Sequence, residues 1–267
     1  MRYEACALSP EALFHRDLGG EGKPPLILLH GILGLSRNWQ TAGRGLAAAF
    51  HVLAPDLRNH GLSPHAQPMT YAAMEADLVA WLAARGLDRV NLVGHSMGGK
   101  VAMLFACRQP SRVEKLVVVD IAPIDYHWVG HREEFAAMNE LDLRTLKSRA
   151  EAEARMEARV PSLALRKFLL TNLERTDSGG WKWLIDLPIL TAALANLERN
   201  SLGPDDRFSG PTLFLTGGKS NYVQPTALPA IRRHFPAAQQ VAIPEAGHNP
   251  HMDARETFVR HVLEFLA

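Results

Sequence analysis

The sequence predicts an α/β fold in which a mostly parallel central sheet is flanked by helices. Short apolar runs rich in β-branched residues alternate with longer segments whose apolar residues recur at helical spacing. This alternation is typical of a parallel sheet that is covered on both faces. The chain has 267 residues, of which 47% are hydrophobic, and this is enough for one sizeable core.

The expected strands and helices follow one another in order along the chain. Before residue 120, the expected strands are Pro25–Leu29, His51–Ala54, Val90–Val93 and Val113–Val119. The expected helices between them are Asn38–Ala49, Tyr71–Arg85 and Met97–Arg108. After residue 210 the alternation resumes, with strands at Thr212–Thr216 and Gln239–Ile243 and helices at Thr226–His234 and Asp253–Leu266.

Residues 121–210 interrupt this alternation. They contain no strand of comparable strength, and they show four segments of helical period: His131–Glu140, Arg144–Arg159, Leu163–Leu173 and Pro188–Leu197. Inserts of this size that have their own helices are usually functional lids. We therefore expect a core of residues 1–120 and 211–267, with a helical cap of residues 121–210 inserted after the sixth core strand.

Charge and cysteine content narrow the class of protein. A formal net charge of +1 gives no reason to expect nucleic acid or an anionic membrane as a partner. No apolar run approaches the ~20 residues of a membrane span, and the first residues lack the apolar core of a signal peptide. The two cysteines, Cys6 and Cys107, form no disulfide framework. We expect a cytoplasmic protein with reduced thiols; the sequence gives no indication of its oligomeric state.

The stretch G-H-S-M-G-G-K-V, residues 94–101, fits two motifs. As G-x-x-x-x-G-K it resembles a P-loop, but that loop needs Ser or Thr after the lysine to bind magnesium, and Val101 stands there. As G-x-S-x-G it is a nucleophile elbow, which requires a strand, a sharp turn and a helix. The expected strand Val90–Val93 and the helix that begins at Met97 supply this context. We therefore predict that Ser96 is a nucleophile.

A serine nucleophile needs a base and donors for the oxyanion. The sequence G-H-N-P-H near the C-terminus places His248 after the last expected strand, in the chain order Ser, acid, His. His248 would take the proton of Ser96 and return it to the leaving group. The backbone N–H of Met97, at a helix start, is one expected oxyanion donor. The second is Ile32 in H-G-I-L-G, with Leu33 as the alternative.

Other histidines raise the question of a metal site. His251 and Asp253 lie close to His248 in sequence, but no clear further ligands complete a set. We expect His251 to pack or to hydrogen-bond behind the site. His127 and His131 are spaced i,i+4, and we find no acidic residue at matching spacing, so we expect surface or cap positions. We expect neither a metal nor a cofactor.

Four motifs in this order, H-G-I-L-G, D-L-R-N-H-G-L-S, G-H-S-M-G-G and G-H-N-P-H, resemble the α/β-hydrolase family. Within it, V-V-V-D-I-A-P-I-D-Y (residues 117–126) and G-W-K-W (residues 180–183) resemble the YbfF-type carboxylesterases and thioesterases. The resemblance covers nearly the whole chain and is weakest in the cap. It implies the α/β-hydrolase fold and serine ester or thioester hydrolysis without a cofactor. Arg58, in the second motif, is expected to hold a sharp loop.

The acid of the triad departs from the commoner family pattern. Many members carry it as G-x-x-D after the strand that follows the cap, and here Ser220 stands at that position. Asp120 ends the preceding strand of the expected core, at the carboxyl edge of the sheet where ligands gather. Asp56 belongs to a turn motif, and Asp205 and Asp206 lack a strand to fix them. We predict Asp120 as the acid, with a loop-capping role as the alternative, and Ser220 as a supporting residue.

The predicted function is hydrolysis of carboxylic esters, or of acyl thioesters, with small to medium acyl groups through an acyl-enzyme on Ser96. A small-molecule ester or thioester is the expected partner, and the cap is expected to cover Ser96 and to form most of the acyl pocket. A cofactor-free perhydrolase or a C–C bond hydrolase would use the same triad. The charged cap disfavours a long-chain lipase. A non-catalytic binding protein on the same fold predicts a broken triad.

Overall fold

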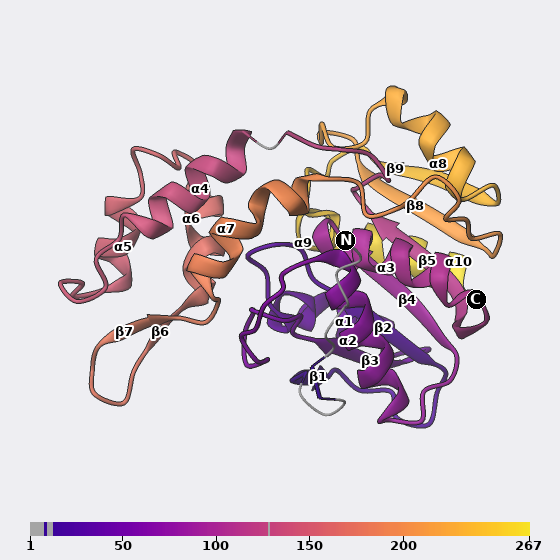
Figure 1. Ribbon diagram of the computed structural model, residues 1–267, viewed down its shortest axis with the longest axis horizontal. Helices are drawn as coiled ribbons and strands as arrows, with labels where there is room; N and C mark the ends of the chain where they lie inside the picture. Colours follow the sequence, from indigo (N-terminus) through magenta and orange to yellow (C-terminus); the bar gives the residue numbers. More distant parts are fainter. Residues whose placement is uncertain (1–7, 10–12, 128) are drawn as a thin grey trace.

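The computed structural model describes residues 8–9, 13–127 and 129–267 (Figure 1). Its main sheet has seven strands in the order β1-β3-β2-β4-β5-β8-β9, and β1 alone runs antiparallel to its neighbour. The strands are β1 (His15–Asp17), β2 (Pro25–Leu29), β3 (His51–Pro55), β4 (Val90–His95), β5 (Val113–Val119), β8 (Thr212–Gly217) and β9 (Ala238–Ile243). The mostly parallel sheet that the sequence predicts is confirmed.

Two helical layers cover the two faces of this sheet. In β2, Ile27 and Leu29 pack into one apolar cluster, and Leu26 and Leu28 pack into the other. Successive side chains of a strand point to opposite faces of the sheet. Because both faces are covered here, every position of the strand is apolar. The first cluster includes side chains of α2 (Tyr71–Ala83), α3 (Met97–Arg108) and α8 (Leu228–His234). The second includes those of α1 (Gln40–Leu46) and α10 (Arg255–Leu266).

Several expected helices are shorter or divided in the structure. The expected helix Asn38–Ala49 is a 3-10 turn, η1 (Ser36–Trp39), followed by α1, and the C-terminal helix is preceded by α9 (Pro250–Asp253). Further 3-10 turns are η2 (Pro110–Arg112), η3 (Leu170–Asn172) and η4 (Pro225–Ala227). The prediction also omitted β1, because three residues with little apolar character give no strand signal.

The segment between β5 and β8 holds most of the residues assigned to a cap. It contains α4 (Val129–Asn139), α5 (Arg149–Arg155), α6 (Leu163–Leu169), a hairpin of β6 (Leu173–Arg175) and β7 (Trp181–Trp183), and α7 (Leu187–Glu198). We call residues 121–210 the inserted segment. Figure 1 shows its helices and hairpin at one end of the molecule, beside the main sheet.

The inserted segment differs from the expectation in its strands and helices. The sequence places it after the sixth core strand; within the described residues, the five strands β1 to β5 precede it. The hairpin β6–β7 was not expected, since strands of three residues are too short to show an alternating pattern. The expected helix Arg144–Arg159 is helical only at Arg149–Arg155.

The inserted segment is fastened to the core by buried hydrogen bonds at several points. Asn172 donates from Nδ2 to the carbonyl of Leu33 at 2.7 Å, and the backbone N–H of Asp186 donates to the carbonyl of Asn59 at 2.9 Å. The Tyr71 hydroxyl donates to the Leu197 carbonyl at 2.6 Å, at the C-terminal end of α7. These bonds hold both ends of α7 and join the segment to the loop that follows β2.

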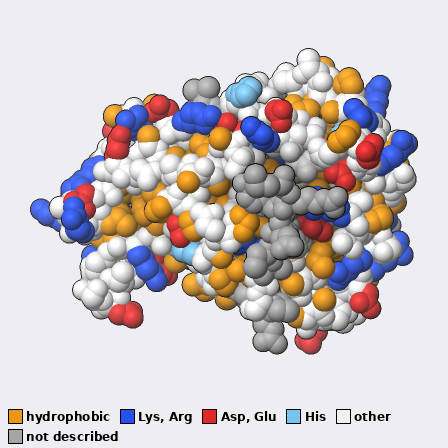
Figure 2. Space-filling model, viewed as in Figure 1, with side chains coloured by type: hydrophobic (Ala, Val, Ile, Leu, Met, Phe, Trp, Pro, Cys, Tyr) orange, Lys and Arg blue, Asp and Glu red, His pale blue; other side chains and the backbone are white. Residues whose placement is uncertain are grey.

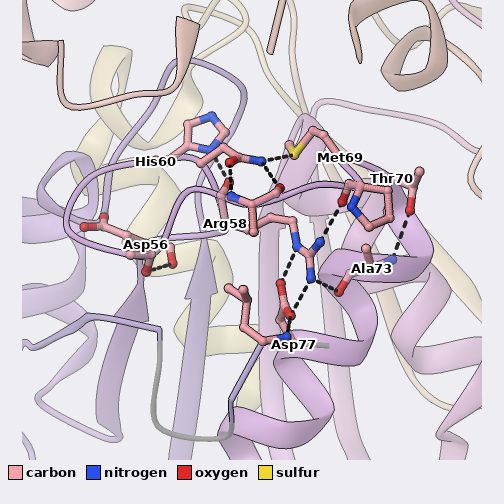
Figure 3. A network of polar contacts seen from close by, with 12 residues as sticks. Asp56, Arg58, His60, Met69, Thr70, Ala73 and Asp77 are labelled. Atoms are coloured by element: carbon pink, nitrogen blue, oxygen red, sulfur yellow. Dashed lines mark hydrogen bonds and ion pairs between the residues drawn. The ribbon is translucent and has the colours of Figure 1, made fainter. Parts of the chain in front are cut away.

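Arg58 is fully buried in the turn after β3, where it organises a polar network (Figure 3). Its Nε and Nη2 atoms donate to the two carboxylate oxygens of Asp77 at 2.5 and 2.6 Å. Its Nη1 donates to the Pro68 carbonyl at 2.6 Å, and Nη2 also reaches the Ala73 carbonyl at 3.3 Å. Arg58 therefore joins the turn to α2, as expected for a residue that holds a sharp loop.

Charged side chains of both signs are mixed on the surface of the protein. Figure 2 shows basic and acidic side chains interspersed over the visible face, including the end formed by the inserted segment. In the part of the chain that the structure describes, no helix is both long and apolar enough to cross a membrane.

Cys107 is a free, half-buried thiol on α3, and its burial raises the pKa of this thiol to about 12. Cys6 lies outside the described residues.

Candidate active site

Ser96 lies in a strained turn between β4 and α3. Its backbone has φ 52° and ψ −118°, which is an unusual conformation for a residue with a side chain. A Cβ atom on Gly94 would lie 2.3 Å from the carbonyl oxygen of Gly98, and one on Gly98 would lie 2.5 Å from that of His30. Glycine is therefore required on both sides of the serine, and this is the geometry of a nucleophile elbow.

The Ser96 hydroxyl faces a cavity of about 300 Å³. Its Oγ is buried and has no hydrogen-bond partner among the described residues. His248 lines the same cavity, so the structure brings the predicted nucleophile and the predicted base to one site. An unpaired hydroxyl beside an imidazole is free to react with a substrate that enters the cavity.

Asp120 and His248 form a direct pair behind the cavity. The Nδ1 atom of His248 lies 2.7 Å from Oδ2 of the fully buried Asp120. The Ser220 hydroxyl donates to the same carboxylate oxygen, and the Gly217 N–H donates to the other oxygen at 2.9 Å. Because Asp120 binds Nδ1–H, the Nε2 atom of His248 is the basic nitrogen. The carboxylate thus holds the imidazole in the tautomer that can accept a proton.

Burial shifts the pKa of both partners. It raises the pKa of Asp120 to about 6, against the opposing effect of the hydrogen bonds from Ser220 and Gly217. Burial, with a smaller effect of His131, lowers the pKa of His248 to about 3. At neutral pH the pair is therefore a charged carboxylate beside a neutral imidazole. Each proton that His248 accepts makes an imidazolium whose countercharge is Asp120.

Of the two expected oxyanion donors, Ile32 lines the cavity and Met97 directly follows Ser96 in the chain. Met97 is the first residue of α3, where backbone N–H groups have no partner within the helix. Ile32 lines the cavity from the loop after β2. Next to it, Leu33 has φ 58°, and its carbonyl is held by Asn172 of the inserted segment. The role of Ile32 and Met97 in binding an oxyanion stays a prediction.

His95 and His251 line the cavity together with His248. The ring of His95 lies 4.8 Å from those of both His248 and His251, and its Nε2 donates to the His248 carbonyl at 2.8 Å. The ring of His251 packs 4.2 Å from that of Trp39, and His251 also lines the cavity, whereas the sequence placed it behind the site. Asp253 accepts the N–H of Gly247 at 2.9 Å. Within the described ranges, no group of three or more His, Cys, Asp or Glu is arranged to hold a metal ion.

The other aspartates considered for the acid have different partners. Asp56 accepts the backbone N–H groups of Ser36 and Leu62, at 2.6 and 3.0 Å, and thus closes a turn. Asp206 accepts the N–H of Gly203 at 2.7 Å in the loop that leaves the inserted segment. The carboxylate paired with His248 is that of Asp120.

The described residues of the inserted segment provide a minority of the cavity wall. The expectation that it forms most of the pocket is wrong: among its described residues, four line the cavity, namely His131, Glu134, Leu165 and Phe168. The core contributes the rest, chiefly from the loops at the carboxyl ends of its strands. Ser96 is nevertheless only 1% exposed.

The polar residues His131, Glu134 and Tyr222 line this cavity and were not predicted as site residues. His131 was expected on the surface or in the cap, without an acidic partner, yet its Nδ1 lies 2.6 Å from Oε2 of Glu134. The spacing i,i+3 within α4 was visible in the sequence and would have indicated this pair. Tyr222, which stacks on His248 with ring centroids 3.5 Å apart, has no local sequence signal.

Strand order, the elbow and its partner histidine together place this protein in one class, the α/β hydrolases with a serine at the elbow. A family model described as "alpha/beta hydrolase fold" matches residues 24–255. The chain belongs to this family.

Two curated relatives cover nearly the whole chain. The sn-1-specific diacylglycerol lipase ABHD11 of Mus musculus is 39% identical, over 99% of this chain and 88% of its own length. Esterase YbfF of Escherichia coli is 34% identical, over 91% of this chain and 92% of its own. A solved structure described as a marine microorganism esterase superposes with a TM-score of 0.92 and 38% identity, covering 95% of this chain and 98% of its own.

Proposed function

We propose that this protein is a carboxylesterase-type serine hydrolase that cleaves carboxylic esters through an acyl-enzyme on Ser96. The observation that carries the proposal is the pairing of Asp120 with His248 at the cavity that contains the unpaired Ser96 hydroxyl. Relatives named as an esterase and a diacylglycerol lipase support ester cleavage.

In the proposed mechanism, Ser96 Oγ attacks the ester carbonyl while His248 Nε2 takes its proton. The N–H groups of Met97 and Ile32 stabilise the oxyanion of the tetrahedral intermediate. His248 then gives the proton to the leaving alkoxide, so an alcohol departs and the acyl group remains on Ser96. Water attacks the acyl-enzyme with the same proton transfers and releases the acid. Asp120 balances the charge of the imidazolium in each half-reaction.

The proposed substrates carry small to medium acyl groups. A cavity of about 300 Å³ stands at the lower end of the range for small-molecule sites. Apolar side chains of Ile32, Leu165 and Phe168 line it and suit an acyl chain. Among the described residues of the inserted segment, the single exposed large apolar side chain is that of Leu163, which is 46% exposed. This does not favour a lid that seeks lipid interfaces.

Several finer points belong to the same proposal. Thioesters could form the same acyl-enzyme and remain candidate substrates. We propose that residues 121–210 act as a cap over Ser96, and that the low cysteine content fits a cytoplasmic location. The perhydrolase, C–C hydrolase and non-catalytic alternatives are not favoured, since the relatives cited above are named for ester hydrolysis.

A panel of p-nitrophenyl esters of rising chain length, assayed beside acyl-CoA thioesters, tests this function. We expect rates to be highest for short to medium esters. The Ser96→Ala variant should retain no more than about 10⁻⁴ of wild-type kcat, and it should no longer react with a fluorophosphonate probe. A folded Ser96→Ala protein that keeps more than about a tenth of the rate would refute the nucleophile.

A further inference from the structure

A second carboxylate–imidazole pair lies at the cavity, and Tyr222 connects it to the first. The Tyr222 ring lies flat on His248, with centroids 3.5 Å apart and planes inclined by 14°. Its hydroxyl is 3.2 Å from Nε2 of His131. On the other side of that imidazole, Nδ1 is 2.6 Å from Oε2 of Glu134. Glu134, His131 and Tyr222 thus form a chain, here called the α4 relay, that ends on the face of the catalytic imidazole.

We propose that the α4 relay positions His248 and makes its orientation depend on the docking of helix α4. The proposal rests on the proposed function, because it assigns His248 the role of general base. Two members, His131 and Glu134, belong to α4 in the inserted segment, whereas Tyr222 lies in the core loop after β8. Through these contacts, an element outside the core reaches the reacting imidazole.

His248 needs this support because its backbone lies in a loop between β9 and α9 and its side chain is 22% exposed. The bond to Asp120 fixes Nδ1, but a single hydrogen bond leaves the ring able to turn about that direction. The Tyr222 ring closes one face of the imidazole. With this contact in place, Nε2 is held in the orientation required for proton transfer.

Tyr222 is itself held from three directions. Its N–H donates to Ser220 Oγ at 3.2 Å, and its carbonyl accepts the Tyr126 hydroxyl at 2.8 Å. These two bonds place its backbone on the core, beside the Asp120 pair. The hydroxyl at the far end of the ring reaches His131, so the angle at which the ring lies on His248 depends on α4.

The aromatic ring of the relay also favours the imidazolium that forms during catalysis, in opposition to the smaller effect of His131, which lowers the pKa of His248. When His131 Nδ1–H donates to Glu134, its Nε2 accepts the proton of the Tyr222 hydroxyl. Burial raises the pKa of Tyr222, so the phenol stays protonated and can donate. The face of a tyrosine ring is electron-rich and attracts a cation stacked on it. The relay therefore presents this face to His248 at the moment when His248 becomes positive.

Four variants of the full chain test the α4 relay. Tyr222→Leu removes the ring and should lower kcat by roughly 10-fold. Tyr222→Phe keeps the ring but loses the hydrogen bond to α4. Its kcat should therefore be higher than that of Tyr222→Leu and about 3-fold below that of wild type. Glu134→Gln keeps the shape of the side chain and should resemble Tyr222→Phe. Glu133→Gln, on the exposed face of the same helix, is the matched control and should behave as wild type.

The decisive readout is the division of the effect between kcat and KM. A positioning role predicts that kcat falls by the same factor for every ester in the panel while KM stays constant. If instead KM rises for some esters and kcat is kept, these residues bind substrate and the proposal is overturned. Wild-type kcat in both Tyr222→Phe and Glu134→Gln would also overturn it. Thermal unfolding checks that these two near-isosteric variants are folded.

Fluorophosphonate labelling separates failure of this proposal from failure of the proposed function. The probe reports the reactivity of Ser96 with its base and needs no particular ester. We expect labelling rates to follow the order wild type, Tyr222→Phe, Tyr222→Leu. If wild type labels but cleaves no ester or thioester, the proposed function fails while this order still tests the relay. Equal labelling rates in all three proteins would overturn the relay alone.

Discussion

Asp120 Oδ2 lies 2.7 Å from Nδ1 of His248, although Asp120 precedes the inserted segment and His248 follows it by several elements. The sheet explains this proximity. Strands β5 and β8 are neighbours, with Val119 paired to Leu215, so their carboxyl ends emerge side by side. A carboxylate after either strand can reach the same imidazole. Ser220, in the loop after β8, donates to the carboxylate that stands after β5.

This arrangement predicts that Asp120→Asn will nearly abolish activity. An amide at this position favours the wrong tautomer of His248 and provides no countercharge, and the same change in a well-studied serine protease lowers kcat by ~10⁴-fold. The double variant Asp120→Asn with Ser220→Asp returns a carboxylate to the neighbouring loop. We expect its kcat to exceed that of Asp120→Asn alone. Steady-state kinetics on one short ester suffice for the comparison.

Ser220→Ala is the control for these variants. It removes one hydrogen bond to Asp120 and leaves the carboxylate, so we expect about a 5-fold decrease in kcat, the equivalent of ~1 kcal/mol. Should Asp120→Asn cost no more than Ser220→Ala, Asp120 would be a loop-capping residue, and the acid would have to be another carboxylate.

The pH dependence of kcat/KM follows from the shifted pKa of Asp120. The proposed reaction needs this group ionised, and burial raises its pKa to about 6. Activity should therefore be full near pH 7.5 and should fall as pH decreases through about 6, with an apparent pKa that belongs to the Asp120–His248 pair. Ser220→Ala removes a bond that favours the charged carboxylate, so its acid limb should move to higher pH. An unchanged limb in that variant would contradict the assignment.

Arg58 should matter for stability and not for the chemical step. Arg58→Met removes one partner of a fully buried ion pair and leaves Asp77 without its countercharge, which typically costs 3–5 kcal/mol. Urea unfolding should show this loss, and Arg58→Met with Asp77→Leu should recover part of it. The kcat of the folded fraction should stay within about 2-fold of wild type, since Arg58 contacts neither Ser96 nor His248 in its network. A large decrease in kcat without a loss of stability would contradict this prediction and would indicate that Arg58 takes part in catalysis.

The features that could be predicted are those that leave a pattern within one segment of the sequence or follow from the order of strands in the sheet. The parallel strands could be predicted because strands such as β2 and β4 are buried on both faces and therefore consist mainly of apolar residues. The pairing of Asp120 with His248 could be inferred because strand ends meet at one edge of a sheet. The hairpin β6–β7 was not legible, because its strands have three residues each. The stacking of Tyr222 on His248 depends on tertiary packing between loops, and no local pattern indicates it.

Lys100 belongs to the stretch that also fits a P-loop, and the structure gives this residue a different setting. Its side chain is fully buried and donates to the carbonyls of Glu198 and Arg199, at 3.1 and 2.6 Å. Lys100 thus joins the helix that begins after Ser96 to the C-terminal end of α7. Burial lowers its pKa to about 7, with Asp125 and Glu198 acting in the opposite direction.

This lowered pKa predicts how stability changes with pH. Between about pH 7 and 10.5, the unfolded chain binds a proton at Lys100 that the folded protein has largely lost. Wherever the unfolded state binds more protons, stability increases with pH. The unfolding free energy of wild type minus that of Lys100→Met should therefore increase from pH 7 to pH 9.5, by an amount on the order of a few kcal/mol. Urea denaturation at several pH values measures it. A constant difference would mean that folded Lys100 keeps an ordinary pKa and remains charged between its two carbonyl partners.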